Sequence, residues 1–253
     1  MNDMAQVTRN DMPAGERLAS AFFPELAQYE AAALSSLVGV HRFVGRNVTI
    51  AREAERLDKL RFFVSGWAMK NVSISNDRRQ IIGFVLPGNL EGLHTDFQRA
   101  STADVVTLTS CEIAEFSLGD IMGLTRDFNG IAAAFRGYMA REAAYLGDQV
   151  LRLGRMTAYE RVCHFLLEVF DRQCQVMENG QTVHFPITQS IVADALGLSV
   201  VHVNRQIMRL RQERLLDLSR KTLTILDLEA MMRISGYKSR RMPAVSAFTD
   251  AAE

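Results

Sequence analysis

The side chains of this chain that are best suited to contact a nucleic acid lie on one helical face between residues 200 and 210. Asn204 and Arg205 are adjacent, and Val201 and Met208 lie one turn before and one turn after them, so all four project in one direction. An asparagine amide pairs through two hydrogen bonds with N6 and N7 of adenine, and an arginine guanidinium does the same with O6 and N7 of guanine. The face therefore predicts contacts to base edges in a DNA major groove.

Two short helices joined by a tight turn, within residues 187–216, must position this face. Thr188 and Ser199 are residues that cap helix N-termini, and Gly197 can take the positive φ of the turn. The second helix carries an apolar stripe that is expected to be buried, formed by Val200, Val203, Ile207 and Leu210. Two packed core helices would share this pattern, but an exposed asparagine–arginine pair favours a helix-turn-helix that binds DNA.

A short hairpin is predicted directly after the second helix. From Leu215 to Leu226, apolar and polar residues alternate around the sequence Ser219-Arg220-Lys221. A hairpin in this place is typical of the wing of a winged helix, where basic side chains meet the DNA backbone. Arg220 and Lys221 are therefore expected to contact phosphate groups.

Charge is distributed unevenly along the chain, although the formal net charge is zero. Residues 1–150 carry 15 basic and 18 acidic side chains, a balance of −3, whereas residues 151–253 carry 14 and 11, a balance of +3. A mildly acidic N-terminal half joined to a basic C-terminal half is typical of a regulator that binds DNA through one of its domains. The length of 253 residues suits about two domains.

Several other classes of protein are disfavoured by the sequence. The three cysteines are widely spaced and form neither a zinc-finger pattern nor a disulfide framework, so no metal site is expected. No apolar run has the length of a signal peptide core or a membrane span, which predicts a cytoplasmic protein without a membrane partner. No phosphate-binding loop, metalloprotease motif or serine-hydrolase motif is present, so no catalytic residues are assigned and the chain is not expected to be an enzyme.

The N-terminal half predicts a β-roll followed by a long helix. Between His41 and Phe116, short runs of Val, Ile, Phe and Thr alternate with glycine turns, which indicates an antiparallel barrel or roll. After Leu118 the pattern becomes helical, and a stripe over about three heptads predicts either packing on the roll or the interface of a parallel dimer. We expect part of the stripe to pack on the roll and the stripe also to form the interface of a parallel dimer. Its residues are Ile131, Phe135, Tyr138, Glu142, Tyr145, Gln149 and Arg152.

This order of roll, long helix and winged helix resembles the Crp/Fnr family of bacterial transcription regulators. The resemblance rests on residues 77–89 in the roll, 153–166 before the C-terminal part and 195–205 in the helix-turn-helix. It implies an α+β protein that binds double-stranded DNA as a homodimer at a near-palindromic operator and contacts RNA polymerase. The implied parts are a cyclic-nucleotide-binding-like antiparallel β-roll at 18–127, a dimerisation helix at 128–153, a winged helix-turn-helix at 154–230 and flexible tails at 1–17 and 231–253.

The resemblance also assigns roles within the helix-turn-helix. Base-facing positions of the family fall on Val201, Asn204 and Arg205. Many relatives have glutamate where Val201 stands; a valine cannot accept a hydrogen bond from cytosine but packs on a thymine methyl group, so a different operator base is expected there. Phosphate-contacting positions fall on Thr188, Gln189, Ser190, Ser199 and His202.

The effector of the family is not recognisable in this sequence. Members that bind cyclic AMP hold its phosphate with a glutamate and with an arginine that precedes serine or threonine. By resemblance these positions fall on Glu91 and on the pair Ser101-Thr102, so a serine replaces the arginine, and Arg99 lies two residues away. A buried phosphate without its bidentate cation loses its strongest contact, so cyclic AMP is not the expected effector. Glu91, Arg99, Ser101 and Thr102 remain the candidates for an effector pocket.

Two further sensing mechanisms can be weighed. Residues 1–40 contain no cysteine, so the iron–sulfur cluster of the oxygen-sensing members is not expected. Haem would need an axial ligand, for which His41, His94 and Cys111 are the candidates, but nothing else supports it. The cofactor therefore stays open. The alternative function is a cyclic-nucleotide-type or haem-type sensor module that acts on a protein partner.

Overall fold

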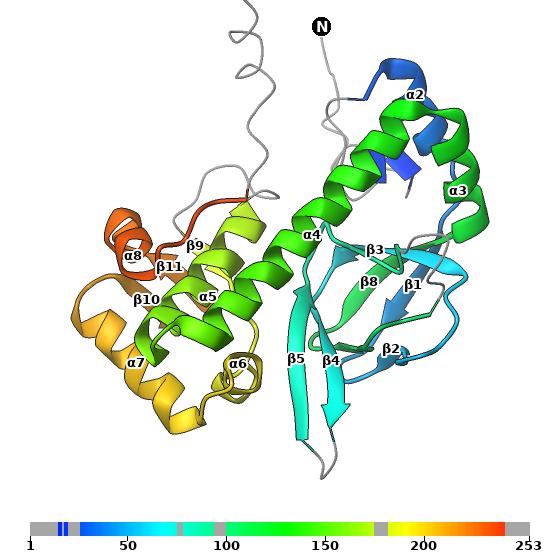
Figure 1. The fold of residues 1–253 in the computed structure, drawn as a ribbon. Coiled ribbons are helices and arrows are strands. Elements are labelled where there is room, and N and C mark those ends of the chain that lie inside the picture. The colour runs from blue at the N-terminus through cyan, green and yellow to red at the C-terminus, as the bar shows by residue number, and fades with distance from the viewer. Residues whose placement is uncertain are drawn as a thin grey trace, which may run out of the picture.

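The computed structural model describes residues 15–16, 18–19, 26–74, 78–93, 100–174 and 182–240. A β-roll lies on one side and a compact, mainly helical unit on the other, with the long helix α4 (Asn129–Arg155) running between them (Figure 1). The expected α+β architecture of roll, long helix and winged helix-turn-helix is confirmed.

In the part of the roll that the structure describes there are eight strands. They are β1 (Val40–Val44), β2 (Thr49–Ala51), β3 (Lys59–Ser65), β4 (Ala68–Ile74), β5 (Arg78–Val85), β6 (Leu90–Glu91), β7 (Asp104–Thr107) and β8 (Cys111–Ser117). They form two antiparallel sheets in the orders β1-β8-β3-β6 and β2-β7-β4-β5. The turn from β3 to β4 needs Gly66, because its φ is +87° and a Cβ atom there would lie 2.4 Å from the Ser110 carbonyl oxygen.

Helices cover the outer face of the first sheet. The N-terminal part of α4 packs there together with α2 (Gln28–Ser35) and α3 (Leu118–Asp127), around a core that includes Leu34, Phe62 and Phe116. The Glu30 side chain joins two of these helices, because its Oε1 accepts a hydrogen bond from the Gly130 backbone N–H at 2.7 Å. A carboxylate at the N-terminus of α4 also interacts favourably with the dipole of that helix.

The stripe on α4 that we expected to form a dimer interface is turned inward, so that expectation is wrong for its residues. Ile131, Phe135 and Tyr138 are buried against the roll, and the Tyr138 hydroxyl exchanges two hydrogen bonds with the backbone of Leu90. Tyr145, Gln149 and Arg152 are buried farther along the helix, and Glu142 is half-buried. The alternative of packing within the chain therefore holds, because a stripe wide enough to bury in a dimer is equally suited to bury on the roll.

The C-terminal unit begins after α4 and contains four helices and one small sheet. The helices are α5 (Ala158–Cys174), α6 (Gln189–Leu196), α7 (Val200–Gln212) and α8 (Leu228–Ser235), and the strands are β9 (Thr182–His184), β10 (Leu216–Ser219) and β11 (Thr222–Ile225). The sheet has the antiparallel order β10-β11-β9. The predicted hairpin after the second helix of the helix-turn-helix is therefore present as β10 and β11.

Both tails are shorter than we expected, because residues assigned to each of them are packed in the structure. Gly15 is buried, and a Cβ atom there would lie 2.4 Å from the Ser35 carbonyl oxygen, so residue 15 packs against the C-terminal end of α2. At the other end, α8 continues to Ser235 and the chain stays packed to Arg240. The Tyr237 hydroxyl donates to Asp171 at 2.9 Å, and the Arg240 guanidinium pairs with the Asp148 carboxylate of α4. These polar contacts to distant helices leave no periodic signal in the sequence.

A continuous core joins the roll to the C-terminal unit. Trp67, which precedes β4, and Phe84 of β5 pack with Phe165 of α5 and with Phe185, which precedes α6. Ring centroids lie 5.6–6.5 Å apart in tilted or edge-on pairs, the arrangement that aromatic rings favour. The C-terminal unit is therefore packed on the roll through aromatic side chains from both parts.

Candidate DNA-binding surface

The helix-turn-helix has the local geometry that its sequence predicts. The Thr188 hydroxyl accepts from the Ile191 N–H at the start of α6, and the Ser199 hydroxyl accepts from the His202 N–H at 3.2 Å at the start of α7. Between the helices Gly197 adopts a left-handed conformation with φ +61°, and its N–H donates to the Ala193 carbonyl.

The side chains predicted to contact bases lie together on the outer side of α7. This recognition face consists of Val201, Asn204, Arg205 and Met208, all exposed, and it borders a shallow hollow that also includes Gln189. Val201 is 67% exposed, as its expected role requires. Val200 was assigned to the buried stripe, but it is 46% exposed because the first residue of α7 lies beyond the contact with α6. Val203, Ile207 and Leu210 are buried as predicted.

The arginines around α7 differ in whether they have partners. Arg209 pairs with Glu213 at 2.8 Å and lies over the Tyr159 ring, and Arg211 pairs with Asp217 at 3.1 Å. Arg205 makes no ion pair or hydrogen bond within the described part of the chain. All the N–H donors of the Arg205 guanidinium therefore remain available to another molecule.

The wing presents two cations at its tip. Arg220 and Lys221 are exposed and connect β10 to β11 with φ values of 49° and 62°, the conformation of a two-residue type I′ turn. The Lys221 carbonyl accepts a hydrogen bond from the Phe185 N–H at 2.7 Å, which fixes the tip against the segment before α6.

The remaining residues predicted to contact phosphate lie at the N-terminal ends of α6 and α7. Thr188, Ser190, Ser199 and His202 are exposed. Helix N-termini attract anions because their first N–H groups lack partners within the helix. Gln189 differs, because it is half-buried and its Oε1 accepts a hydrogen bond from Asn204 Nδ2 at 3.0 Å. The structure therefore joins Gln189, a predicted phosphate contact, to Asn204, a predicted base contact, by a hydrogen bond.

The C-terminal carbonyl groups of α6, at residues 194–196, are held by side chains of three other elements. Gln80 of β5 donates to the first two of them at 3.2 Å each, Gln149 of α4 donates to the second at 2.6 Å, and Arg161 of α5 donates to the third at 2.8 Å. The last carbonyls of a helix have no partner within the helix. These three side chains satisfy them and at the same time attach α6 to the roll and to α4.

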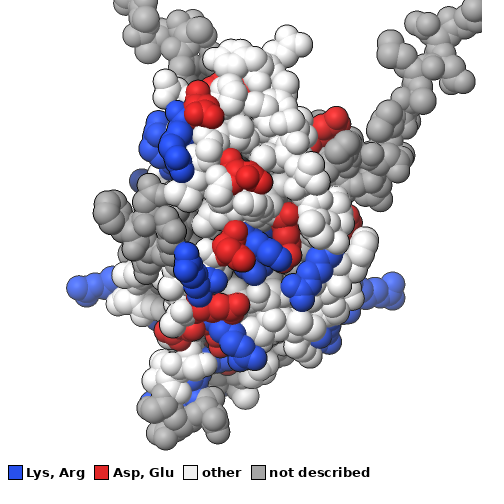
Figure 2. Space-filling model, turned by 90° about the vertical axis from the view of Figure 1, so that its right-hand side faces the viewer, with Lys and Arg blue, Asp and Glu red and all other residues white. Residues whose placement is uncertain are grey.

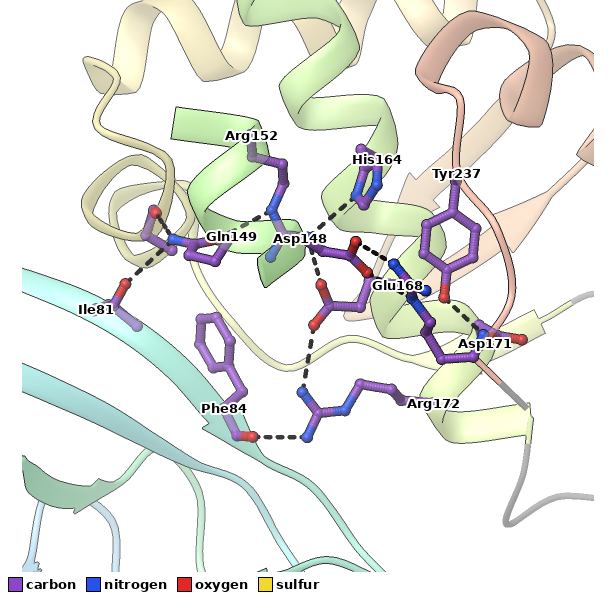
Figure 3. Close-up of polar contacts among 12 residues, drawn as sticks. Ile81, Phe84, Asp148, Gln149, Arg152, His164, Glu168, Asp171, Arg172 and Tyr237 are labelled. Carbon is purple, nitrogen blue, oxygen red and sulfur yellow. Dashed lines mark hydrogen bonds and ion pairs between the residues drawn. The ribbon is translucent and has the colours of Figure 1, made fainter. Parts of the chain in front are cut away.

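A buried group of polar side chains lies between α4, α5 and the roll. This interdomain cluster consists of Gln149, Arg152, His164, Glu168 and Arg172 (Figure 3). Arg152 donates to both Glu168 and His164 Nδ1, and to Gln149 Oε1 at 3.0 Å, while Arg172 donates to the other Glu168 oxygen at 3.4 Å. One carboxylate therefore compensates two buried guanidinium groups, an arrangement that the sequence analysis did not find.

Arg172 extends this cluster into the roll. Its Nη2 donates to the Phe84 carbonyl at 2.9 Å and to Asn89 Oδ1 at 2.7 Å. Its guanidinium also lies 4.6 Å from the centre of the Tyr145 ring. Burial alone would lower the pKa of Arg172, but Glu142 and Glu168 outweigh it and raise the pKa, so the residue stays charged.

His164 is uncharged at neutral pH. Burial, and after it the neighbouring positive charge of Arg152, lower its pKa to about 4. The Arg152 guanidinium, which always donates, therefore faces an unprotonated Nδ1.

The candidate effector residues are only partly brought together. Glu91 is buried and its Oε2 lies 2.5 Å from Lys70 Nζ, and Ser101 is buried with its hydroxyl donating to the Ala103 carbonyl. Thr102 lines a cavity of about 240 Å³ between β5, α4 and α5, which Lys70 also lines. Arg99 and His94 lie outside the described residues. Of the haem candidates, His41 hydrogen-bonds Glu112 and Cys111 is buried against the backbone of Trp67.

Comparison with known proteins identifies both parts of the chain. Residues 41–127 match the cyclic nucleotide-binding domain, and residues 160–234 match the Crp-like helix-turn-helix domain. The chain is 28% identical to the transcriptional activatory protein AadR of Rhodopseudomonas palustris over 74% of this chain and 77% of that protein. It is 30% identical to the nitrogen fixation regulation protein FixK of Rhizobium meliloti over 62% and 69% of the respective chains.

A solved structure shares the fold. FixK2 from Bradyrhizobium japonicum superposes with a TM-score of 0.72 at 22% identity, covering 80% of this chain and all of that one. The fold and its helix-turn-helix thus define a DNA-binding transcription regulator with a sensor-type roll. The chain belongs to the Crp/Fnr family, whose members regulate transcription and are not enzymes.

Two surface properties complete the description. Within the described residues no helix is both long and apolar enough to cross a membrane. The face seen in Figure 2, on the right-hand side of Figure 1, carries interleaved basic and acidic side chains over an otherwise uncharged surface. That face lies away from α7, which is on the left of Figure 1, so the recognition face belongs to a different side of the molecule.

Proposed function

We propose that the protein binds a near-palindromic operator as a homodimer, with α7 of each protomer in the DNA major groove. The observation that carries this proposal is the recognition face, where Val201, Asn204 and Arg205 are exposed on a capped helix while the neighbouring Arg209 and Arg211 are paired with acids. Two copies would read half-sites about one helical turn apart.

The dimer interface that we propose lies on the outer face of α4, opposite the expected stripe. Residues on this face alternate in steps of four and three and are small or apolar: Ala133, Gly137, Ala140, Ala144, Gly147, Leu151 and Gly154. A Cβ atom added at Gly137, Gly147 or Gly154 would meet nothing within 4 Å, and Leu146 and Val150 beside them are exposed. Alternating steps of four and three are the spacing of a parallel helix pair, and small side chains allow its two backbones to approach closely.

Phosphate groups would be held at the edges of the recognition face. Arg220 and Lys221 of the wing and the hydroxyl groups of Thr188, Ser190 and Ser199 are all exposed, and His202 is exposed beside them. Such contacts fix the register of the protein on DNA without reading sequence.

The signal that controls binding would be a small ligand other than cyclic AMP. The cavity lined by Thr102 and Lys70 supports a ligand with hydrogen-bond acceptors, because the Tyr145 hydroxyl and Arg172 Nε at this cavity are buried without a hydrogen-bond partner among the described residues. Glu91 would act through Lys70 rather than through an arginine.

The remaining parts of the proposal follow from DNA binding. The roll at 18–127, the helix at 128–153 and the winged helix from 154 would act as sensor, dimerisation helix and DNA-binding domain in the cytoplasm. RNA polymerase would be the protein partner.

Selection of binding sites from random DNA tests this function. The wild-type protein is expected to enrich a near-palindrome with a thymine at the base pair facing Val201. Val201→Glu should move that preference toward cytosine, because a carboxylate accepts a hydrogen bond from cytosine N4. An unchanged preference in the variant would remove Val201 from the interface, and failure of the wild type to enrich any sequence would favour a sensor module that acts on a protein.

A further inference from the structure

The hydrogen bond between Gln189 and Asn204 joins two side chains with different expected roles. Gln189 is the first residue of α6 and Asn204 lies in the middle of α7, so the contact crosses from one helix of the motif to the other. Asn204 Nδ2 donates to Gln189 Oε1 at 3.0 Å, and both side chains border the hollow along the recognition face. A base that entered this hollow would meet an asparagine amide that is already engaged.

The direction of this hydrogen bond determines what Asn204 can offer to a base. Its amide has two N–H donors and one carbonyl acceptor, and one of the donors is used by Gln189. One donor and one acceptor remain in a fixed plane. Adenine presents one acceptor, N7, and one donor, N6, in the major groove, whereas guanine presents two acceptors. The engaged amide therefore matches adenine.

Gln189 lies on a helix whose two ends are held in place, so it can fix the orientation of the Asn204 amide. It is half-buried and directly follows the capping residue Thr188. The other end of α6 is held by Gln80, Gln149 and Arg161, which belong to three different elements. Within the described part of the chain Gln189 Nε2 donates to no other group, so the same side chain can contact a phosphate while its carbonyl holds Asn204.

We infer that Gln189 is a positioning residue that orients the Asn204 amide and thereby sets a preference for adenine at one operator position. This inference rests on the proposed function and goes beyond it, because it assigns sequence selectivity to a side chain that faces the DNA backbone. It also predicts that the two residues act as a unit, so that removal of either one removes the contribution of both.

Three substitutions separate this role from a simple phosphate contact. Gln189→Met keeps the size of the side chain but removes the acceptor. Gln189→Glu keeps the acceptor and adds a negative charge near the DNA backbone. Gln212→Met is the matched control, because Gln212 lines the same hollow without a hydrogen bond to Asn204 among those of the described residues. Each variant is titrated as the full-length protein against the selected operator and against three operators changed at the base pair facing Asn204.

Gln189→Met is expected to lower the ratio of affinities for adenine over the other bases by roughly 3- to 10-fold, the equivalent of one hydrogen bond. Gln189→Glu should keep this ratio while weakening binding to all four operators, because its carboxylate still accepts from Asn204 and repels phosphate. Gln212→Met should leave the ratio within about twofold. In an Asn204→Ala background, Gln189→Met should change the ratio no further.

The outcomes distinguish the inference from the function on which it rests. If wild-type protein selects no operator, both fail. If Asn204→Ala changes the base preference but Gln189→Met does not, DNA recognition stands and the positioning role is overturned. Loss of the preference in Gln189→Glu as well as in Gln189→Met would also overturn it, because the acceptor would then not be the group that matters.

Discussion

The recognition face and the interdomain cluster use the same side-chain types in opposite ways. In the cluster, Arg152 and Arg172 are buried and share the carboxylate of Glu168. On the recognition face, Arg205 is exposed and makes no ion pair within the described part of the chain. A buried charge must be paired to be tolerated, whereas an exposed charge needs no partner to keep the fold. Pairing therefore separates the arginines that hold the two domains together from Arg205, which is available to DNA.

The strongest test of this difference removes the shared carboxylate. Glu168→Ala removes the carboxylate that pairs with the buried Arg152 and leaves the buried Arg172 with only the more distant Glu142, at 3.8 Å, so the free energy of unfolding should fall by about 3–5 kcal/mol. Urea unfolding followed by far-UV circular dichroism measures it. The matched control is Glu213→Ala, which removes the exposed partner of Arg209 and should cost at most about 1 kcal/mol.

Equal losses in the two glutamate variants would show that the cluster is no more stabilising than a surface ion pair. If Glu168→Ala unfolds outright, Glu168→Gln gives the measurable variant, because an amide can still accept one hydrogen bond. Its loss should fall between the other two.

The second test addresses Arg205 on the recognition face, which has no ion pair among the described residues. Arg205→Ala should cost about 1–3 kcal/mol of binding to the operator and relax the preference at one guanine. Its unfolding free energy should stay within about 0.5 kcal/mol of wild type, since the side chain is exposed and has no partner to lose. Fluorescence anisotropy with operator and with random DNA separates the roles, and equal losses on both would make Arg205 a phosphate contact.

Protonation of His164 provides a third test, confined to the interdomain cluster. Its pKa is lowered to about 4 in the folded protein, first by burial and then by Arg152, from about 6.5 in an unfolded chain. Above pH 6.5 the ring is neutral in both states and contributes nothing. As the pH falls from 7 to 5, His164 is protonated in the unfolded state but stays neutral in the folded state. The unfolding free energy should therefore fall by about 1–2 kcal/mol.

The difference between wild type and His164→Gln over that pH range measures this contribution, because carboxylates common to both proteins cancel. A wild-type protein whose pH dependence matched that of the variant would contradict the lowered pKa.

The recognition face was predictable from sequence because its signals are local. The capping residues Thr188 and Ser199, the turn at Gly197 and the exposed face of α7 all depend on residues within one short stretch. The roll was predictable as a class for the same reason, through strand patterns and glycine turns. Val200, the first residue of α7, was predicted to be buried but is exposed.

The interdomain cluster was not predictable because its contacts join residues far apart in the chain. Gln149 and Arg152 share the period of the apolar stripe on α4, and periodicity alone cannot tell whether such a stripe faces a second copy or its own roll. One signal was available: Glu168 and Arg172 interrupt the apolar face of α5, and charged residues inside a buried helix need partners. The partners themselves could come only from the structure.

The smallest expected effect concerns the tip of the wing, where affinity and stability should move in opposite directions. Lys221→Gly removes one cation from each protomer, so the slope of log affinity against log salt should fall by about 0.9 per protomer of the proposed dimer, which is roughly eightfold in affinity per protomer at 0.1 M salt. The same change places glycine at a residue with φ +62°, in the turn type that favours glycine there, so stability should stay equal or rise by up to about 1 kcal/mol. Salt-dependent anisotropy and urea unfolding measure the two effects. Lys221→Met is the control, because it loses the same charge without relieving the backbone. If Lys221→Gly lost both affinity and stability, the wing tip would be held by its side chain, and the contrast between paired and unpaired cations would not extend to the wing.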